Sequence, residues 1–249
     1  MPAHIGIVAC SAEGAALCYR TICVEGADLF GPHAHPEVSM HTPSLADYVA
    51  HLERDDWPAV GELMLASAHK LARIGADFLI CPDNTLHQAL PHVLPRSPLP
   101  WLHIAQVAAD EAVARGFRRI GITGTKWLVD SEVYPEAFAA RGLAFERPDT
   151  GERIECNRII MDELVRSQFK PASVEYFRQV IGRLKEHDCD AVVLACTEIP
   201  LIVSDQNSPL PTLDSTRLLA RAALRRASVI PSDARDPSCG LKDPSLRSG

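Results

Sequence analysis

Several features of membrane, exported and nucleic-acid-binding proteins are missing from this sequence of 249 residues. No apolar run approaches the roughly 20 residues that a membrane-spanning helix needs, and no cleavable apolar leader precedes the first strand, predicted to begin at Ile5. The formal net charge is −7, and the Lys and Arg residues are scattered rather than gathered on one stripe. We therefore predict a globular, cytoplasmic protein that binds neither a membrane nor nucleic acid.

The sequence also lacks the cysteine spacing of a redox or zinc site. None of its eight cysteines forms a Cys-x-x-Cys pair, and a reducing compartment disfavours disulfides. Most are interpreted as small buried hydrophobic residues. His33 and His35 form a His-x-His pair between prolines, which we interpret as a solvated turn, so the sequence predicts no metal site.

What the sequence does contain is an internal repeat. Residues 76–87 read ADFLICPDNTLH and residues 189–200 read CDAVVLACTEIP: an Asp, an apolar β-forming run, a group that can carry a proton, and a Thr. Asp83 and Cys196 each lie six residues after that Asp (83 − 77 and 196 − 190). Upstream, residues 4–11 (HIGIVACS) resemble residues 119–126 (RIGITGTK), which makes the order and spacing of the two halves match.

Strands that alternate with helical patterns predict a parallel α/β fold. With the repeat, this gives two similar α/β lobes, residues 1–100 and 101–205, with the active site in the cleft between them. A final helix at about 214–227 is predicted to return to the first lobe. The composition of residues 228–249, rich in Ser, Pro, Asp and Arg, predicts a tail without stable structure.

Local signals place several element ends. Thr42 is predicted to cap a helix that starts at Pro43, and a helix over residues 58–74 is predicted to stop at Gly75. Residues 101–104 are predicted to form a strand, Asp130 or Ser131 to cap the next helix, and residues 158–165 to form a later one.

Two proton carriers at the ends of matching strands suit inversion of a stereocentre, because one proton must leave one face while another arrives on the opposite face. A thiol such as Cys196 has an ordinary pKa near 8.5, which donors or a helix N-terminus can lower. Asp83 is a weak base unless its pKa is raised. Other roles stay open: Asp83 as a turn residue, Cys81 as an alternative thiol or a core residue, and His87 as a structural or catalytic group.

Small polar residues near these strand ends are candidates for holding an anionic substrate, although helix capping would explain several of them as well. Residues 121–125 (GITGT) lack the full glycine pattern and lysine of a phosphate loop and are interpreted as a strand end. Arg166 is the candidate cationic anchor, with a solvated helix surface as the alternative. The predicted substrate-binding residues are Ser11, Thr42, Asn84, Thr85, Thr125, Arg166 and Thr197.

The segments IGIVACSAEGAALCY, GADFLICPDNTLH, GITGT and VVLACTEIPLIV resemble the aspartate/glutamate racemase family over residues 5–227. The resemblance implies a two-lobed, cofactor-independent and often dimeric enzyme with one catalytic cysteine from each lobe. Cys196 matches the second cysteine, whereas Asp83 stands where the family usually has the first. Tyr48 stands where one branch has an Arg, so the chain is closer to the branch that racemises acidic L-amino acids.

The resemblance thus implies a homodimeric isomerase that racemises or epimerises an amino acid such as aspartate or glutamate, with Cys196 and Asp83 as acid/base groups. Two alternatives stay open. One is a single-cysteine decarboxylase or isomerase of a small carboxylic acid, and the other is an inactive relative that binds a small molecule. The sequence does not separate them.

Overall fold

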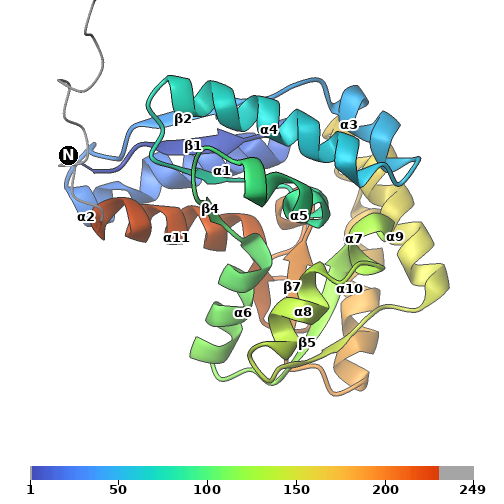
Figure 1. Ribbon diagram of the computed structural model, residues 1–249. Helices are drawn as coiled ribbons and strands as arrows, with labels where there is room; N and C mark the ends of the chain where they lie inside the picture. The colour runs from blue at the N-terminus through green and yellow to red at the C-terminus, as the bar shows by residue number, and fades with distance from the viewer. Residues whose placement is uncertain (1, 230–249) are drawn as a thin grey trace, which may run out of the picture.

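The computed structural model describes residues 2–229 and contains two four-stranded parallel sheets covered by helices (Figure 1). The strand order is β2-β1-β3-β4 in the first sheet and β6-β5-β7-β8 in the second. Each lobe therefore has the same order, with its first strand beside its third, as an internal duplication requires. This arrangement confirms the predicted fold class.

The first lobe is built around an apolar sheet. Its strands are β1 (Ile5–Val8), β2 (Val38–His41), β3 (Phe78–Ile80) and β4 (Trp101–Leu102). Its helices are α1 (Ala12–Glu25), α2 (Ala27–Phe30), α3 (Leu45–Leu52), α4 (Trp57–Arg73) and α5 (Leu90–Val93), with short 3₁₀ turns η1 (Thr85–Ala89) and η2 (Leu94–Arg96). Gly75 ends the α4 turn with a φ of 91°, a conformation that favours glycine.

The second lobe repeats the pattern. Its strands are β5 (Arg119–Gly124), β6 (Ala144–Glu146), β7 (Ala191–Ala195) and β8 (Thr212–Asp214). Its helices are α6 (Ile104–Ala114), α7 (Lys126–Val129), α8 (Val133–Ala139), α9 (Thr150–Asp162) and α10 (Pro171–Glu186), with 3₁₀ turns η3 (Leu164–Arg166) and η4 (Ile199–Leu201). The last helix, α11 (Ser215–Val229), packs Leu219, Ala223 and Leu224 against core residues of β1 and β3.

Two predicted helix starts were wrong, because other residues form the caps, and a third helix begins beside a predicted cap. Ser44, not Thr42, caps α3 by accepting from the Ala46 N–H at 3.3 Å. The helix predicted to follow Asp130 or Ser131 is α8, which begins at Val133, and Ser131 Oγ accepts the Val133 N–H at 3.3 Å; Thr125 caps the short α7 before it. Helix α9 starts at Thr150 because Asp149 and Glu152 form a reciprocal capping box.

The limits of the lobes also differ from the predicted ones. Strand β4 pairs with β3 and belongs to the first sheet, and it stops at Leu102 because α6 begins at Ile104. Helix α11 continues to Val229, so the first two residues of the predicted unstructured tail are helical. The rest of that tail lies outside the described residues.

The Asp that opens each repeat has a structural role. Asp77 accepts the backbone N–H of His4 at 2.6 Å, and Asp190 accepts those of Arg118 and Arg119 at 2.7 and 3.1 Å. Each carboxylate thus ties the start of β3 or β7 to the start of the neighbouring strand. Because the starts are aligned, the carboxyl ends of the paired strands reach the same edge, where ligands of parallel sheets bind.

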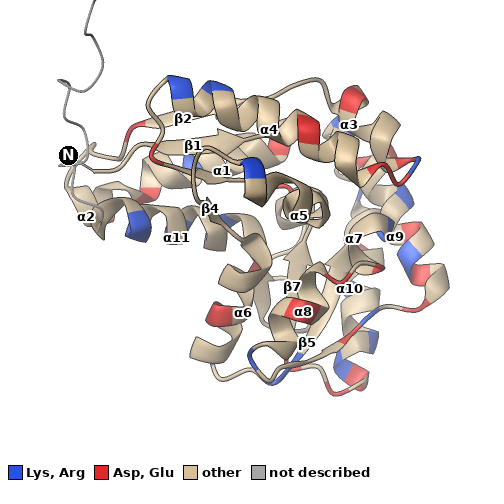
Figure 2. Ribbon diagram, viewed as in Figure 1, with Lys and Arg blue, Asp and Glu red and all other residues tan. Residues whose placement is uncertain are grey.

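Along the helices, basic and acidic residues are interspersed in sequence (Figure 2). Within residues 2–229, no helix is both long and apolar enough to cross a membrane.

Candidate active site

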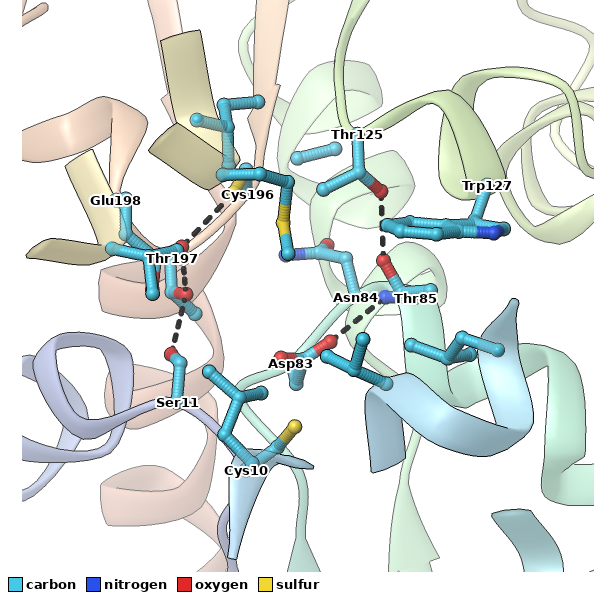
Figure 3. Close-up of a pocket in the computed structure, with 17 residues that line it drawn as sticks. Cys10, Ser11, Asp83, Asn84, Thr85, Thr125, Trp127, Cys196, Thr197 and Glu198 are labelled. Atoms are coloured by element: carbon cyan, nitrogen blue, oxygen red, sulfur yellow. Dashed lines mark hydrogen bonds between the residues drawn. The ribbon is translucent and has the colours of Figure 1, made fainter. Parts of the chain in front are cut away.

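A narrow cleft of about 40 Å³ lies at the carboxyl ends of the two sheets. Asp83 follows β3 of the first lobe and Cys196 directly follows β7 of the second, and both line this cleft (Figure 3). Five further predicted residues also line it: Ser11, Asn84, Thr85, Thr125 and Thr197. The structure therefore brings together seven side chains that were predicted from segments far apart in the sequence.

Two predicted binding residues lie elsewhere. Thr42 is exposed, and its hydroxyl donates to the Pro43 carbonyl at 3.1 Å. Arg166 is exposed at the end of η3 and does not line the cleft, although the preceding Val165 does. The Arg166 side chain is therefore a solvated charge on the protein surface, which is the alternative that the sequence left open.

Two hydroxyl pairs connect the lobes at the floor of the cleft. Ser11 Oγ of the first lobe lies 3.1 Å from Thr197 Oγ1 of the second, and Thr85 Oγ1 lies 3.0 Å from Thr125 Oγ1. In each pair either hydroxyl can be the donor. These contacts hold the ends of strands from both sheets together, and a hydroxyl can rotate to donate to a bound carboxylate instead.

The Asp83 carboxylate is half-buried and accepts the Thr85 N–H at 3.2 Å. Burial, and next the negative charge of Glu198, raise the pKa of Asp83 from 3.8 to about 6. The shift brings Asp83 close to the range in which a carboxyl group can both take and return a proton near neutral pH.

The Cys196 side chain is 6% exposed, and its thiol donates to Glu198 Oε2 at 3.0 Å. Burial and the charge of Glu198 raise the pKa of Cys196 well above its ordinary value. The sequence predicted that donors at a helix start would lower this pKa. The backbone N–H of Glu198 acts in that direction, but burial outweighs it, so Cys196 rests as a thiol.

Glu198 was missed in the sequence although it follows Cys-Thr directly in the CTEIP segment. Its Oε2 also accepts from Thr197 Oγ1 at 2.6 Å, while the buried Oε1 has no hydrogen-bond partner among the described residues. Cys10 was assigned to the core, yet it too lines the cleft. Burial and the neighbouring Asp83 raise the pKa of the Cys10 thiol well above its usual range.

Other candidate groups have structural roles. Cys81 is fully buried, does not line the cleft, and donates to the Asp83 carbonyl at 3.6 Å. His87 Nε2 lies 3.0 Å from the Cys81 carbonyl, and its ring packs on His103 with centroids 4.6 Å apart. The Asn84 amide donates to Ser215 at 3.1 Å and accepts from Tyr134 at 2.7 Å.

In the His-x-His segment, His35 Nδ1 lies 2.8 Å from the Pro36 carbonyl. Among residues 2–229, no group of three His, Cys, Asp or Glu side chains is arranged to hold a metal ion.

Gly14 in the first turn of α1 allows the two lobes to approach closely. A methyl group added there would lie 2.2 Å from Thr197 Cβ. We expect Gly14→Ala to displace Thr197, which lies beside Cys196. The displacement should lower the free energy of unfolding by about 1–3 kcal/mol and reduce turnover. Chemical denaturation measures the first effect, and a rate measurement tests the second. Gly182→Ala in α10, where an added methyl group meets open space, is the control. It should preserve turnover and keep or slightly raise stability, because alanine favours a helix more than glycine does. Equal behaviour of the two variants would contradict the expectation.

The fold and site together define a class: a duplicated α/β protein with one proton-carrying side chain from each lobe at a shared cleft. A family model described as Asp/Glu/Hydantoin racemase matches residues 7–223. The chain belongs to this family.

The individual relatives described here share only 22–26% of aligned residues with this chain. The chain is 22% identical over 172 residues to the broad specificity amino-acid racemase RacX of Bacillus subtilis (strain 168), covering 68% of this chain and 73% of that protein. A crystal structure of a candidate Asp/Glu racemase from Yersinia pestis superimposes with a TM-score of 0.82 at 26% identity, covering 90% of this chain and 99% of the other. An aspartate racemase homologue from Pyrococcus horikoshii OT3 gives 0.78 at 24% identity, covering 92% and 100%. Both solved structures share the fold of this chain over nearly their whole length.

Proposed function

We propose that the protein is a cofactor-independent amino-acid racemase in which Asp83 and Cys196 exchange protons with the α-carbon from opposite sides. The observation that carries this proposal is the position of the two groups at the ends of equivalent strands, facing one cleft from different lobes. The cytoplasmic location and the homodimer remain predictions, as does the acidic substrate that the family resemblance implies.

The protonation states support a complementary pair. At neutral pH the Asp83 carboxyl, with a pKa of about 6, is mostly ionised, whereas Cys196 keeps its proton. In one direction Asp83 removes the α-proton and the Cys196 thiol donates to the opposite face. The products are a protonated Asp83 and a Cys196 thiolate, which is the form that the reverse direction requires.

Stabilisation of the carbanion and the substrate carboxylate falls to donors at the strand ends. The hydroxyls of Ser11, Thr85, Thr125 and Thr197 border the reacting space, and backbone N–H groups of the turns after β3 and β7 are close by. The substrate ammonium can be held by the cleft carboxylates. The two proton carriers then lie on either side of the flattened α-carbon.

The experiment that tests this function is incubation of the protein in D₂O with both enantiomers of several amino acids. Loss of the α-proton is followed by NMR and handedness by chiral chromatography. Exchange with inversion that depends on Cys196 supports the proposal. Exchange with retention indicates a single working face, and absence of exchange with every amino acid rejects racemisation.

Glu198 is expected to set the pH range of activity as a positioning residue. Its charge raises the pKa of both Asp83 and Cys196. The pair holds one proton in either active form, whether the proton lies on Cys196 or on Asp83. The kcat/KM of both enantiomers should therefore follow the same bell-shaped pH profile, which falls where the pair loses that proton or gains a second one. Glu198→Gln removes the charge and should move both limbs to lower pH by about one unit.

Glu175→Gln on the exposed face of α10 is the control for this change and should leave the profile in place. A purely structural role for Glu198 would lower the rate at every pH without moving either limb.

A further inference from the structure

The part of the cleft beyond the reacting groups is an apolar wall. It is formed by residues of α3 in the first lobe and by residues of α7, α9 and η3 in the second. Its members are Leu45, Val49, Leu52, Trp127, Ile160, Met161 and Val165. Both lobes therefore offer hydrocarbon surface to whatever projects from the α-carbon.

The cleft has no positive counterpart for a second substrate carboxylate. Of the described residues that line it, Asp83 and Glu198 have carboxyl groups and none is Lys, Arg or His. Lys126 lies over the Trp127 ring at 4.9 Å but does not itself line the cleft, and Arg166 is exposed.

These charges determine which substrate side chain is tolerated. The side-chain carboxylate of aspartate or glutamate would enter an apolar region next to two acidic groups, with its water removed and no cation to replace it. A hydrocarbon side chain has no such penalty and gains by leaving water. The buried Glu198 Oε1, which lacks a partner among the described residues, adds negative charge beside this region and no donor for a second carboxylate.

We propose that this site takes α-amino acids with uncharged, apolar side chains in preference to aspartate and glutamate, which replaces the acidic substrate that the family resemblance implies. The inference rests on the proposed racemase function. It uses the apolar wall for the side chain, the strand-end donors for the α-carboxylate and the cleft carboxylates for the ammonium.

Three substrates of similar shape test the inference: leucine, asparagine and aspartate. Comparing asparagine with aspartate isolates charge, and comparing leucine with asparagine isolates polarity. We expect the kcat/KM of α-proton exchange to fall at least about tenfold at each step from leucine to asparagine to aspartate, which corresponds to about 1.4 kcal/mol a step. Faster exchange with aspartate than with leucine overturns the inference but leaves the racemase intact. Exchange with none of them, nor with methionine or glutamate, overturns the racemase and the inference with it.

A pair of variants at Val49 provides an independent test. Val49 is half-exposed at the cleft, so a longer side chain can be accommodated there. Val49→Arg supplies the missing cation and should raise the aspartate-to-leucine ratio of kcat/KM at least about tenfold. Val49→Met has similar length without charge and should keep the preference for leucine. An unchanged ratio in Val49→Arg, or the same rise in both variants, contradicts the inference.

Discussion

Replacing Cys196 with serine is expected to reduce racemisation by about 10²–10⁴-fold, the usual contribution of a general acid or base. Serine is nearly isosteric and can donate to Glu198 as the thiol does at 3.0 Å. Its hydroxyl, however, gives up a proton far less readily than a thiol. The variant should therefore fold normally and fail at the step in which sulfur gives or takes the α-proton.

The measurement is kcat/KM in both directions by chiral chromatography, together with the melting temperature. Cys81→Ser is the matched control, because Cys81 is a buried thiol two residues from Asp83 that does not line the cleft. It should retain proton transfer even where the polar hydroxyl lowers stability. Full activity in a well-folded Cys196→Ser protein would remove Cys196 from the mechanism.

The duplicated fold could be predicted because its signals are local and occur twice. An Asp, an apolar run and a proton carrier recur at matching positions, and parallel strands place their carboxyl ends at one edge. Ser11, Thr85, Thr125 and Thr197 follow from the same logic. Each is a small polar residue just beyond a strand, and the structure places all four at the cleft.

The residues that were misplaced depend on packing that no local pattern encodes. Arg166 was chosen for its charge, but η3 turns Val165 to the cleft and leaves Arg166 exposed. Glu198 and Cys10 gain their importance from contacts with the reacting groups. The direction of the Cys196 pKa shift also required the three-dimensional structure, because the extent of burial decides it.

Replacing Asp83 with asparagine should stop inversion while leaving the other face able to react. The amide of the new side chain is neither a base nor an acid near neutral pH, so we expect kcat/KM for racemisation to fall by about 10²–10⁴-fold. Cys196 rests as a thiol, so only its ionised fraction, which grows as the pH rises, can still take an α-proton and return deuterium from solvent to the same face. One enantiomer should therefore exchange in D₂O with retention, faster than it inverts.

The same variant separates the catalytic role of Asp83 from its effect on the fold. The pKa of Asp83 is raised from 3.8 to about 6, so folding opposes its ionisation. The free-energy cost of ionising Asp83 in the folded protein is absent below pH 3.8, the pKa in the unfolded chain, and is fully present above about pH 6. Asparagine carries no charge, so Asp83→Asn should be more stable than the native protein at pH 7.5 by about 1–3 kcal/mol, and this gain should disappear near pH 4.

Chemical denaturation at the two pH values measures the difference. A variant that is inactive and more stable at pH 7.5 is expected if the protein tolerates a costly buried charge for catalysis. An inactive variant that is less stable at both pH values would instead assign Asp83 to the turn after β3, where it accepts the Thr85 N–H. In that case Cys196 would be left as the single proton carrier of the site.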